Sequence, residues 1–417
     1  MPHGSAETLV EELFRHEFAR LVSALARLLG PSHLALAEDV VSDALATAVH
    51  AWRLGAPDNP TGWILRTAQR RAIDVLRRER RFSNLAPELT SESTVTAAVE
   101  AALSPAADAS NQLALMFAIG ASGLGEVTHV TLILRLLCGF SATEIARAFL
   151  VDVATVERRL HRGRTRLKEL GTLGPPATVE EVRERQPSVE QALYLLFNEG
   201  YHGSDPENPL SPALCADALR LVELLLDAPG VERPSLHALA ALFCFNAARL
   251  ATRLDEDGVL VPLAEQDRTR WDRLLFERGV AHLGASAAGE TLTRFHLEAG
   301  MAFEHTSAAS LAETNWPRIV EYFTVLAALS PNPVVAMNHA VARAEVEGLD
   351  LGRRLLGQLA SEAKLLDYSF FWAARADLER RAGNVTQASA FYRRALELAQ
   401  SRAERLSYER RLGALGH

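Results

Sequence analysis

The chain has 417 residues, 48% of them hydrophobic and 23% charged, a composition typical of a globular protein with roughly two to four domains. It contains no apolar run long enough for a membrane span, and residues 1–18 lack a basic stretch followed by an apolar one. We therefore expect no signal peptide and a cytoplasmic location. The net charge of −8 arises beyond residue 173, because residues 1–173 hold 19 basic and 19 acidic side chains.

Alanine, leucine and arginine dominate, while β-branched runs bounded by turn residues are rare, so the sequence predicts an all-α fold. Cys138, Cys215 and Cys244 lie far apart in apolar surroundings, which favours buried thiols over disulfides or a metal site. GASGLG at 120–125 has no preceding strand and no Gly-Lys-Ser/Thr, so we interpret it as a turn between helices. We predict no cofactor and no metal.

Two helices are expected first, over 9–29 and 34–52. In the second helix Glu38, Asp39 and Asp43 are predicted to face outward, away from its apolar positions. From spacing alone these acids could be a docking surface or ordinary solvated carboxylates.

The loop GAPDNPTGW comes next, and a third helix is predicted from Pro60 to about Arg80. Asn59 can cap this helix, because its side chain can accept a free backbone N–H and Pro60 suits the first helical position. Seven arginines fall between residues 66 and 81, against Asp74 and Glu79, so the helix after the loop is strongly basic.

Residues 83–109 are rich in Ala, Ser, Thr and Pro and are expected to form a linker. The stretch from 111 to 140 should then supply supporting helices. Their predicted core residues are Leu113, Met116, Phe117, Leu132, Leu134 and Leu137.

Residues 141–170 are predicted to form a helix, a tight turn and a second helix. Ser141 and Glu144 have the spacing of a capping box, and Asp152 can cap the second helix. That helix has one apolar face and one face with Thr155, Arg159, Arg162 and Arg166. Such a helix suits the major groove of DNA, although a solvated basic surface helix has the same pattern.

Three segments resemble, in this order, the characteristic segments of sigma-70 family transcription factors of the extracytoplasmic-function type: AEDVVSDALATAVHAW, NPTGWILRTAQRRAIDVLRRERR and SATEIARAFLVDVATVERRLHRGRTRLKEL. The resemblance implies a region 2 domain over 1–82, the linker over 83–109 and a region 4 helix-turn-helix domain over 110–172. It implies a promoter-recognition subunit of RNA polymerase, which is not itself an enzyme.

The same resemblance implies roles for single residues. Asp39 and Asp43 would meet the β′ clamp of core RNA polymerase, and region 4 would meet the β flap. The residues implied to bind and melt the minus-10 element are Asn59, Trp63, Arg66, Arg70, Arg71 and Arg77, although Trp63 could also be a core residue. The residues implied to contact the minus-35 element are Thr155, Arg158, Arg159, Arg162 and Arg166.

A second linker is expected over 173–188, followed by an extension over 189–417. Residues 372–398 resemble a tetratricopeptide unit, and Gly348 in an upstream hairpin precedes Gly383 by 35 residues, close to that repeat's period. A stack of helix pairs is therefore favoured, with a non-repetitive helical domain as the alternative.

Polar stretches interrupt the extension at 193–209, 253–272 and 315–317. The extension resembles that of a sigma-factor subgroup with a C-terminal repeat domain, on the basis of Asn198-Glu199-Gly200-Tyr201 and of Gln266-Asp267-Arg268 with Trp271-Asp272. The acids among them could bind a cation, a small molecule or a basic protein. They could equally form satisfied polar turns. The regulatory surface predicted here consists of Asn198, Glu199, Tyr201, Asp255, Glu256, Asp257 and Asp267.

Two other functions remain open at this stage. The first is a stand-alone helix-turn-helix regulator with a ligand- or protein-sensing repeat domain, but the arginine helix after the loop would have no task in a plain duplex binder. The second is an enzyme in the C-terminal half, which the absence of a metal, phosphate or nucleophile motif disfavours.

Overall fold

The structure is a computed structural model. It describes residues 18, 21–26, 34–52, 55, 57–80, 105–120, 123–149, 151–170, 178–203 and 209–416. Phe18 and residues 21–26 are helical and buried, which agrees with the first expected helix as far as it is described.

The chain divides into two compact units. The N-terminal unit comprises residues 1–196 and 227–231, and the C-terminal unit comprises residues 197–226 and 232–417. The boundary between them falls within a helix, after Leu196.

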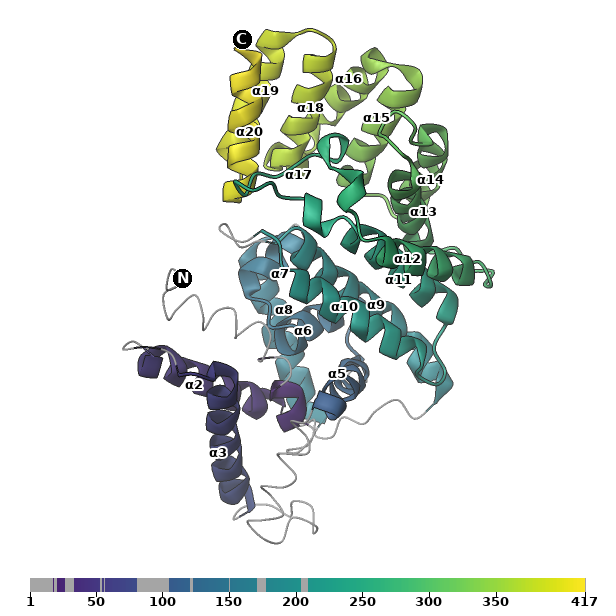
Figure 1. The fold of residues 1–417 in the computed structure, drawn as a ribbon. Helices are drawn as coiled ribbons and strands as arrows, with labels where there is room; N and C mark the ends of the chain where they lie inside the picture. Colours follow the sequence, from purple (N-terminus) through teal and green to yellow (C-terminus); the bar gives the residue numbers. More distant parts are fainter. Residues whose placement is uncertain are drawn as a thin grey trace. The chain divides into compact units, whose positions relative to one another are not determined.

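The N-terminal unit is built from helices alone among its described residues. They are α2 (Leu34–Ala51), α3 (Pro60–Arg80), α5 (Pro105–Gly120), α6 (Glu126–Leu137), α7 (Ala142–Phe149), α8 (Val153–Leu170) and the start of α9 (Val179–Tyr201) (Figure 1). Helix α2 packs on α3, while α6 packs on α5, α7 and α8. All six core residues predicted between 111 and 140 are buried.

The predicted helix starts are present. The Asn59 side chain accepts the Gly62 N–H at 2.8 Å. Ser141 and Glu144 form the expected capping box, with N···O distances of 2.6 and 3.1 Å. Asp152 accepts the Thr155 N–H at 2.7 Å. Residues 123–125 lie between α5 and α6, so the glycine-rich stretch is a helix-to-helix turn as expected.

The C-terminal unit is a succession of helices that pack on their neighbours in chain order (Figure 1). Its elements, after the end of α9, are α10 (Pro212–Leu226), α11 (Arg233–Ala247), η3 (Leu250–Thr252), η4 (Leu263–Glu265), η5 (Arg268–Arg270), α12 (Arg273–Ser286), α13 (Arg294–Ser307), α14 (Trp316–Leu329), α15 (Pro333–Glu347), α16 (Leu349–Gln358), η6 (Leu359–Ser361), α17 (Ala363–Leu366), α18 (Ser369–Arg381), α19 (Val385–Leu398) and α20 (Arg402–Leu415).

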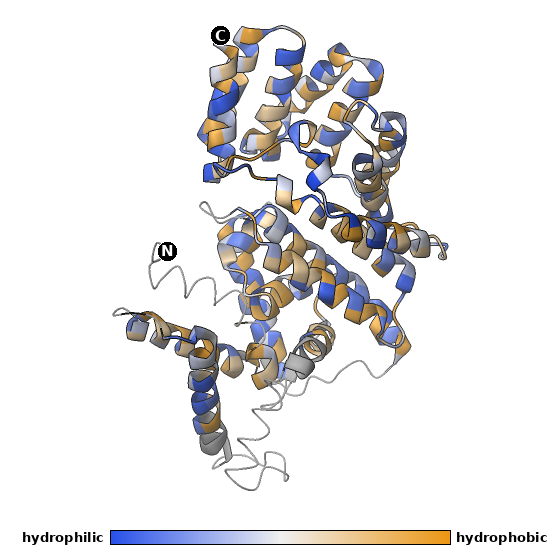
Figure 2. Ribbon diagram, viewed as in Figure 1, coloured by the Kyte–Doolittle hydropathy of each residue, from blue (hydrophilic) through white to orange (hydrophobic). Residues whose placement is uncertain are grey.

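Two of these helix pairs are the hairpins expected from sequence. Gly348 joins α15 to α16 with φ of 98°, and Gly383 joins α18 to α19 with φ of 83°. Glycine reaches this left-handed region without the steric penalty that a Cβ brings. Hydrophobic residues concentrate between packed helices, whereas α3 in the N-terminal unit carries many hydrophilic ones (Figure 2).

The helices extend into both expected linkers. Helix α5 begins at Pro105, so the end of the 83–109 segment is helical. Helix α9 begins at Val179, and its early turns belong to the N-terminal unit. The contact of α9 with the N-terminal unit includes Arg185, which donates to the Phe117 carbonyl on α5 at 3.3 Å. Pro187 lies inside α9, and because proline usually interrupts a helix, the sequence does not predict a helix through this position.

The three cysteines are buried as reduced thiols, as predicted. Among the described residues there is no strand beyond one isolated bridge between Leu254 and Leu260. No described helix combines the length and the hydropathy that crossing a membrane requires.

Candidate nucleic-acid interface

Helix α8 is held on the N-terminal unit by one apolar face. Val156 and Leu160 are buried, as the spacing predicts. Gly163 lies against α6, where an added Cβ would come within 2.9 Å of the Leu132 side chain. This close packing of α6 and α8 orients the opposite face of α8 outward.

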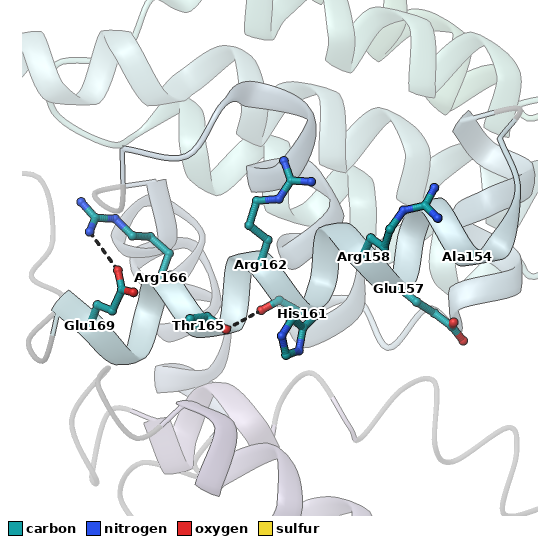
Figure 3. Close-up of a pocket in the computed structure, with 8 residues that line it drawn as sticks. All are labelled: Ala154, Glu157, Arg158, His161, Arg162, Thr165, Arg166 and Glu169. Carbon is teal, nitrogen blue, oxygen red and sulfur yellow. Dashed lines mark hydrogen bonds and ion pairs between the residues drawn. The ribbon is translucent and has the colours of Figure 1, made fainter.

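The outward face of α8 carries three exposed arginines at one-turn intervals, Arg158, Arg162 and Arg166. Figure 3 shows their side chains projecting from one side of the helix. A shallow groove runs along this face, lined by Ala154, Glu157, Arg158, His161, Arg162, Thr165, Arg166 and Glu169. Within it, Arg166 pairs with Glu169 at 3.2 Å. The face is therefore cationic, with acids at its margins.

Arg159 does not lie fully on this face. The sequence predicts it beside Arg162, but the structure turns it half-buried toward α7, with its guanidinium carbon 5.8 Å from the centre of the Phe149 ring. Thr155 belongs to the helix start, because its hydroxyl donates to Asp152 at 2.8 Å and accepts from Arg158 at 2.7 Å. Those hydrogen bonds from Thr155 lower the pKa of the Asp152 carboxyl.

Glu38 departs from expectation. The sequence predicts it outward with Asp39, whereas its side chain is buried and accepts two hydrogen bonds from Arg164 at 2.5 and 2.7 Å. Arg135 on α6 is 3.6 Å away. Arg164 is therefore engaged inward, in contrast to the exposed arginines on the same helix. Helical spacing alone could not reveal this pair, because its partners are 126 residues apart.

The start of α3 lies beside an aromatic pair. Trp63 is half-buried and meets buried Trp52 edge to face, with ring centres 5.5 Å apart. Trp63 thus has a packing role, and part of its surface remains open. Asn59 caps the helix and is itself exposed.

The arginines of α3 divide into two kinds. Arg66 and Arg70 are exposed. Arg71 instead joins α3 to α2, pairing with Asp43 at 2.8 Å and donating to the Thr47 hydroxyl at 2.7 Å. The Arg77 side chain lies outside the described residues.

Asp39 and Asp43, expected together at a polymerase contact, are both exposed on α2. They differ in their partners, because Asp43 is the acid that pairs with Arg71.

The residues predicted as a regulatory surface do not share one environment. Glu199 and Tyr201 are buried near the end of α9, and the Asn198 carbonyl accepts the His202 N–H at 2.7 Å. Tyr201 lies under the Arg253 guanidinium, whose carbon is 3.9 Å from the ring centre.

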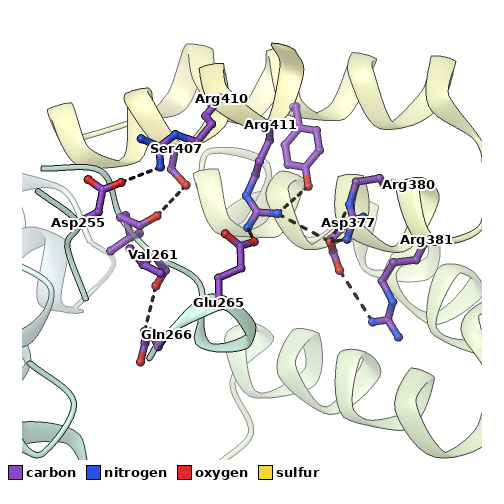
Figure 4. Close-up of polar contacts among 12 residues, drawn as sticks. Asp255, Val261, Glu265, Gln266, Asp377, Arg380, Arg381, Ser407, Arg410 and Arg411 are labelled. Carbon is purple, nitrogen blue, oxygen red and sulfur yellow. Dashed lines mark hydrogen bonds and ion pairs between the residues drawn. The ribbon is translucent and has the colours of Figure 1, made fainter. Parts of the chain in front are cut away.

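The predicted acids of the 253–272 segment mostly stabilise that segment. Asp255 accepts the N–H groups of Asp257 and Val259 at 3.0 and 2.9 Å. It also pairs with Arg410 on α20 at 2.7 Å, as Figure 4 shows, and Asp257 lies 3.6 Å from the same arginine. Glu256 is exposed.

Asp267 caps the short helix η5 by accepting the Thr269 hydroxyl and N–H at 2.6 and 3.0 Å. The polar Asn315 likewise caps α14, accepting the Arg318 N–H at 3.3 Å. No group of three or more His, Cys, Asp or Glu residues within the described part of the chain is arranged to hold a metal ion.

Comparison with known proteins gives three matches along the chain. Residues 13–82 match the family model for sigma-70 region 2, and residues 124–167 match that for sigma-70 region 4. These two matches support a sigma-70 family factor. Helices α2 and α3 fall within the region 2 match, and α6, α7 and most of α8 fall within the region 4 match.

The third match, over residues 185–287, is to a family of unknown function, DUF6596. A relative from Rhizobium meliloti (strain 1021), described as an uncharacterized protein, is 30% identical over 392 residues, which cover 92% of each chain. No solved structure matches. The sigma-70 regions indicate DNA binding in promoter recognition, with core RNA polymerase and promoter DNA as partners, and a transcription factor rather than an enzyme.

Proposed function

We propose that the chain is an alternative sigma factor of the extracytoplasmic-function type, acting in the cytoplasm, with a tetratricopeptide-like extension that modulates its activity. The observation that carries the proposal is the row of exposed arginines Arg158, Arg162 and Arg166 on the second helix of a helix-turn-helix in region 4. Guanidinium groups bind phosphates and fork onto guanine edges, each good bidentate contact being worth about 1–3 kcal/mol of discrimination.

At the minus-35 element, α8 would enter the major groove with these three side chains. Thr155 and Arg159 would contribute less directly, since Thr155 is engaged with Asp152 and Arg159 is half-buried on Phe149. The exposed face is the one that a duplex can reach.

At the minus-10 element, we assign Arg66 and Arg70 to the DNA backbone, because both are exposed on α3 after the 55–62 loop. Asn59 and the open part of Trp63 would face the extruded bases. Unstacking a base costs a few kcal/mol, which cationic contacts and a base pocket offset. We give Arg71 a positioning role, since it is paired with Asp43.

On α2, exposed Asp39 is the better candidate for the polymerase β′ clamp, with Asp43 orienting the helix pair through Arg71. For the extension, the tetratricopeptide likeness is supported by two helical hairpins whose turn glycines are 35 residues apart and by packing in chain order.

The test is the double variant Arg66→Ala/Arg70→Ala in run-off transcription with purified core polymerase. These substitutions leave the Trp63–Trp52 contact intact. We expect duplex promoter binding to be largely kept and permanganate-sensitive opening to be lost, and a pre-melted minus-10 bubble should restore transcription. The matched control, Arg270→Ala/Arg273→Ala, removes two exposed arginines of the C-terminal unit and should open promoters normally.

Normal opening by the Arg66/Arg70 variant would contradict the proposal. Regulation by the wild-type protein bound to DNA without any contact with core polymerase would instead favour a stand-alone helix-turn-helix regulator.

A further inference from the structure

Three arginines gather in the C-terminal unit without an acidic partner among the residues that the structure describes. Arg249 follows α11, Arg253 follows η3 and Arg268 lies in η5. Arg249 is 9% exposed and Arg253 is 6% exposed, values rarely seen for arginine unless it is paired. Two carboxylates between residues 253 and 272 pair with α20 instead, Asp255 with Arg410 and Glu265 with Arg411. None within the described residues comes within 4.0 Å of the three guanidinium groups.

Arg249 and Arg253 bind only neutral groups among the described residues. Arg249 Nε donates to the Gln266 side-chain oxygen at 3.2 Å. Arg253 Nη2 lies 3.0 Å from His202 Nδ1, and the Arg253 guanidinium stacks on Tyr201. The buried Arg253 Nε has no hydrogen-bond partner in the part of the chain that the structure describes. His202 is exposed, so solvent reaches the edge of this group.

Arg268 and Arg249 lie near the same tryptophan ring. Its guanidinium carbon lies 4.6 Å from the Trp271 ring centre, and that of Arg249 lies 5.6 Å from it. Arg268 Nη1 donates to the His305 and Ala308 carbonyls at 2.6 and 2.7 Å. Its buried Nη2 has no partner among the described residues.

The positive charges act on one another and on His305. Burial and then the charges of Arg253 and Arg268 lower the pKa of Arg249, opposed in part by Tyr201. Burial, Arg249 and Arg268 lower the pKa of His305 to about 4. The His305 imidazole is thus neutral at pH 7, and Glu313 acts on Arg268 only from beyond ion-pair distance.

Removing charged groups from water without a counter-ion is unfavourable, and folded proteins normally avoid it. We propose that Arg249, Arg253 and Arg268 form a binding site for a small molecule that carries a phosphate or carboxylate group. Guanidinium groups recognise both oxyanions through paired N–H donors, and Trp271 and Tyr201 supply flat apolar walls. Because Arg249 and Arg253 are buried, a small anion suits them better than the backbone of a nucleic acid duplex does.

The full-length protein is titrated with inorganic pyrophosphate and, separately, with citrate, at constant ionic strength maintained with chloride. The unfolding midpoint and tryptophan fluorescence are followed. We expect a saturable rise of the midpoint with at least one anion, and the arm that saturates at lower concentration identifies phosphate or carboxylate as the group bound. Because the assay contains neither DNA nor polymerase, its result does not depend on the proposed promoter function.

The variant Arg253→Gln should weaken this binding by about tenfold or more, since it removes a charged donor. The matched variant Arg273→Gln changes an arginine whose side chain is 87% exposed and should bind as the wild type does. If neither anion saturates, or if both variants respond equally, the site does not exist.

Stability without the anion provides a second measurement. In chloride alone, Arg253→Gln should unfold at a midpoint equal to or above that of the wild type, because the substitution relieves repulsion with Arg249. A lower midpoint combined with unchanged anion binding would identify Arg253 as purely structural and contradict the proposal. Should Arg253→Gln fail to fold, the same pair of measurements on Arg268→Gln decides.

Discussion

The two arginine groups of this protein occupy opposite environments. Arg158, Arg162 and Arg166 are exposed on α8, where water solvates them and where we propose that promoter DNA binds. Arg249 and Arg253 are buried in the C-terminal unit, where water solvates them poorly and where we propose that a small anion binds. The same side chain thus supports a different proposal in each unit, and burial makes the difference.

The largest effect is expected from Arg162→Glu, which places a negative charge in the middle of the exposed arginine row of α8. The affinity of the polymerase complex for promoter DNA should fall about 10- to 100-fold, through loss of a charged contact and added repulsion. Filter binding or fluorescence anisotropy at fixed salt measures it. Arg273→Glu makes the same charge change on α12 and should leave the affinity for promoter DNA unchanged. Equal losses of affinity in the two variants would contradict a contact between α8 and DNA.

A second prediction concerns the arginine of α8 that is engaged inward. Glu38→Gln removes the carboxylate that pairs with Arg164 and lies near Arg135. We expect the free energy of unfolding of the N-terminal unit to fall by about 1–3 kcal/mol, because the arginines lose a buried charged acceptor. Chemical denaturation followed by circular dichroism measures it.

The neighbouring residue provides the control for that experiment. Asp39 is exposed, so Asp39→Asn should change the free energy of unfolding by less than about 0.5 kcal/mol. Equal effects of the two substitutions would mean that the Glu38 pair does not stabilise the fold.

The smallest effect is expected for a substitution of Asp255, and it concerns the thermal stability of the protein. Hydrogen bonds from the Val259 N–H and from Arg410 lower the pKa of Asp255 in the folded state. This stabilisation is therefore present above the pKa of an unfolded aspartate, about 3.9, and is lost as the pH falls through the lower folded value.

Asp255→Asn should accordingly lower the unfolding midpoint by about 1–3 °C at pH 7, and the difference from wild type should shrink below about pH 4. Thermal unfolding across this pH range measures it. A difference that is constant with pH would show that the charge of Asp255 contributes nothing.

Much of the fold could be predicted from the sequence, because the deciding signals are local. The capping box of Ser141 and Glu144, the Asn59 cap and the turn at Gly383 each depend on residues only a few positions apart. Helical periodicity likewise identified Val156 and Leu160 as core residues.

The side-chain contacts of the candidate sites were harder to predict, because the contacting residues are distant in the sequence. Nothing local indicates that Glu38 meets Arg164, that Asp43 meets Arg71, or that Arg249 lies near Arg268. From the sequence we singled out the acids of the 253–272 segment, whereas Arg253 at the start of that segment is buried, as is Arg249 before it. The position of Arg249 beside an apolar helix end is the one sequence signal that could have suggested a buried arginine.

Helix α20 closes the C-terminal unit on a segment about 150 residues earlier in the chain. Ser407 donates to the Leu260 carbonyl at 3.0 Å, and Arg411 pairs with Glu265 at 3.0 Å (Figure 4). A ribosome makes α20 long after the 253–272 segment, so this segment lacks these anchors until translation has passed α20. Chains terminated before α20 could stack their earlier helices, but their 253–272 segment would remain without its contacts to Ser407 and Arg411.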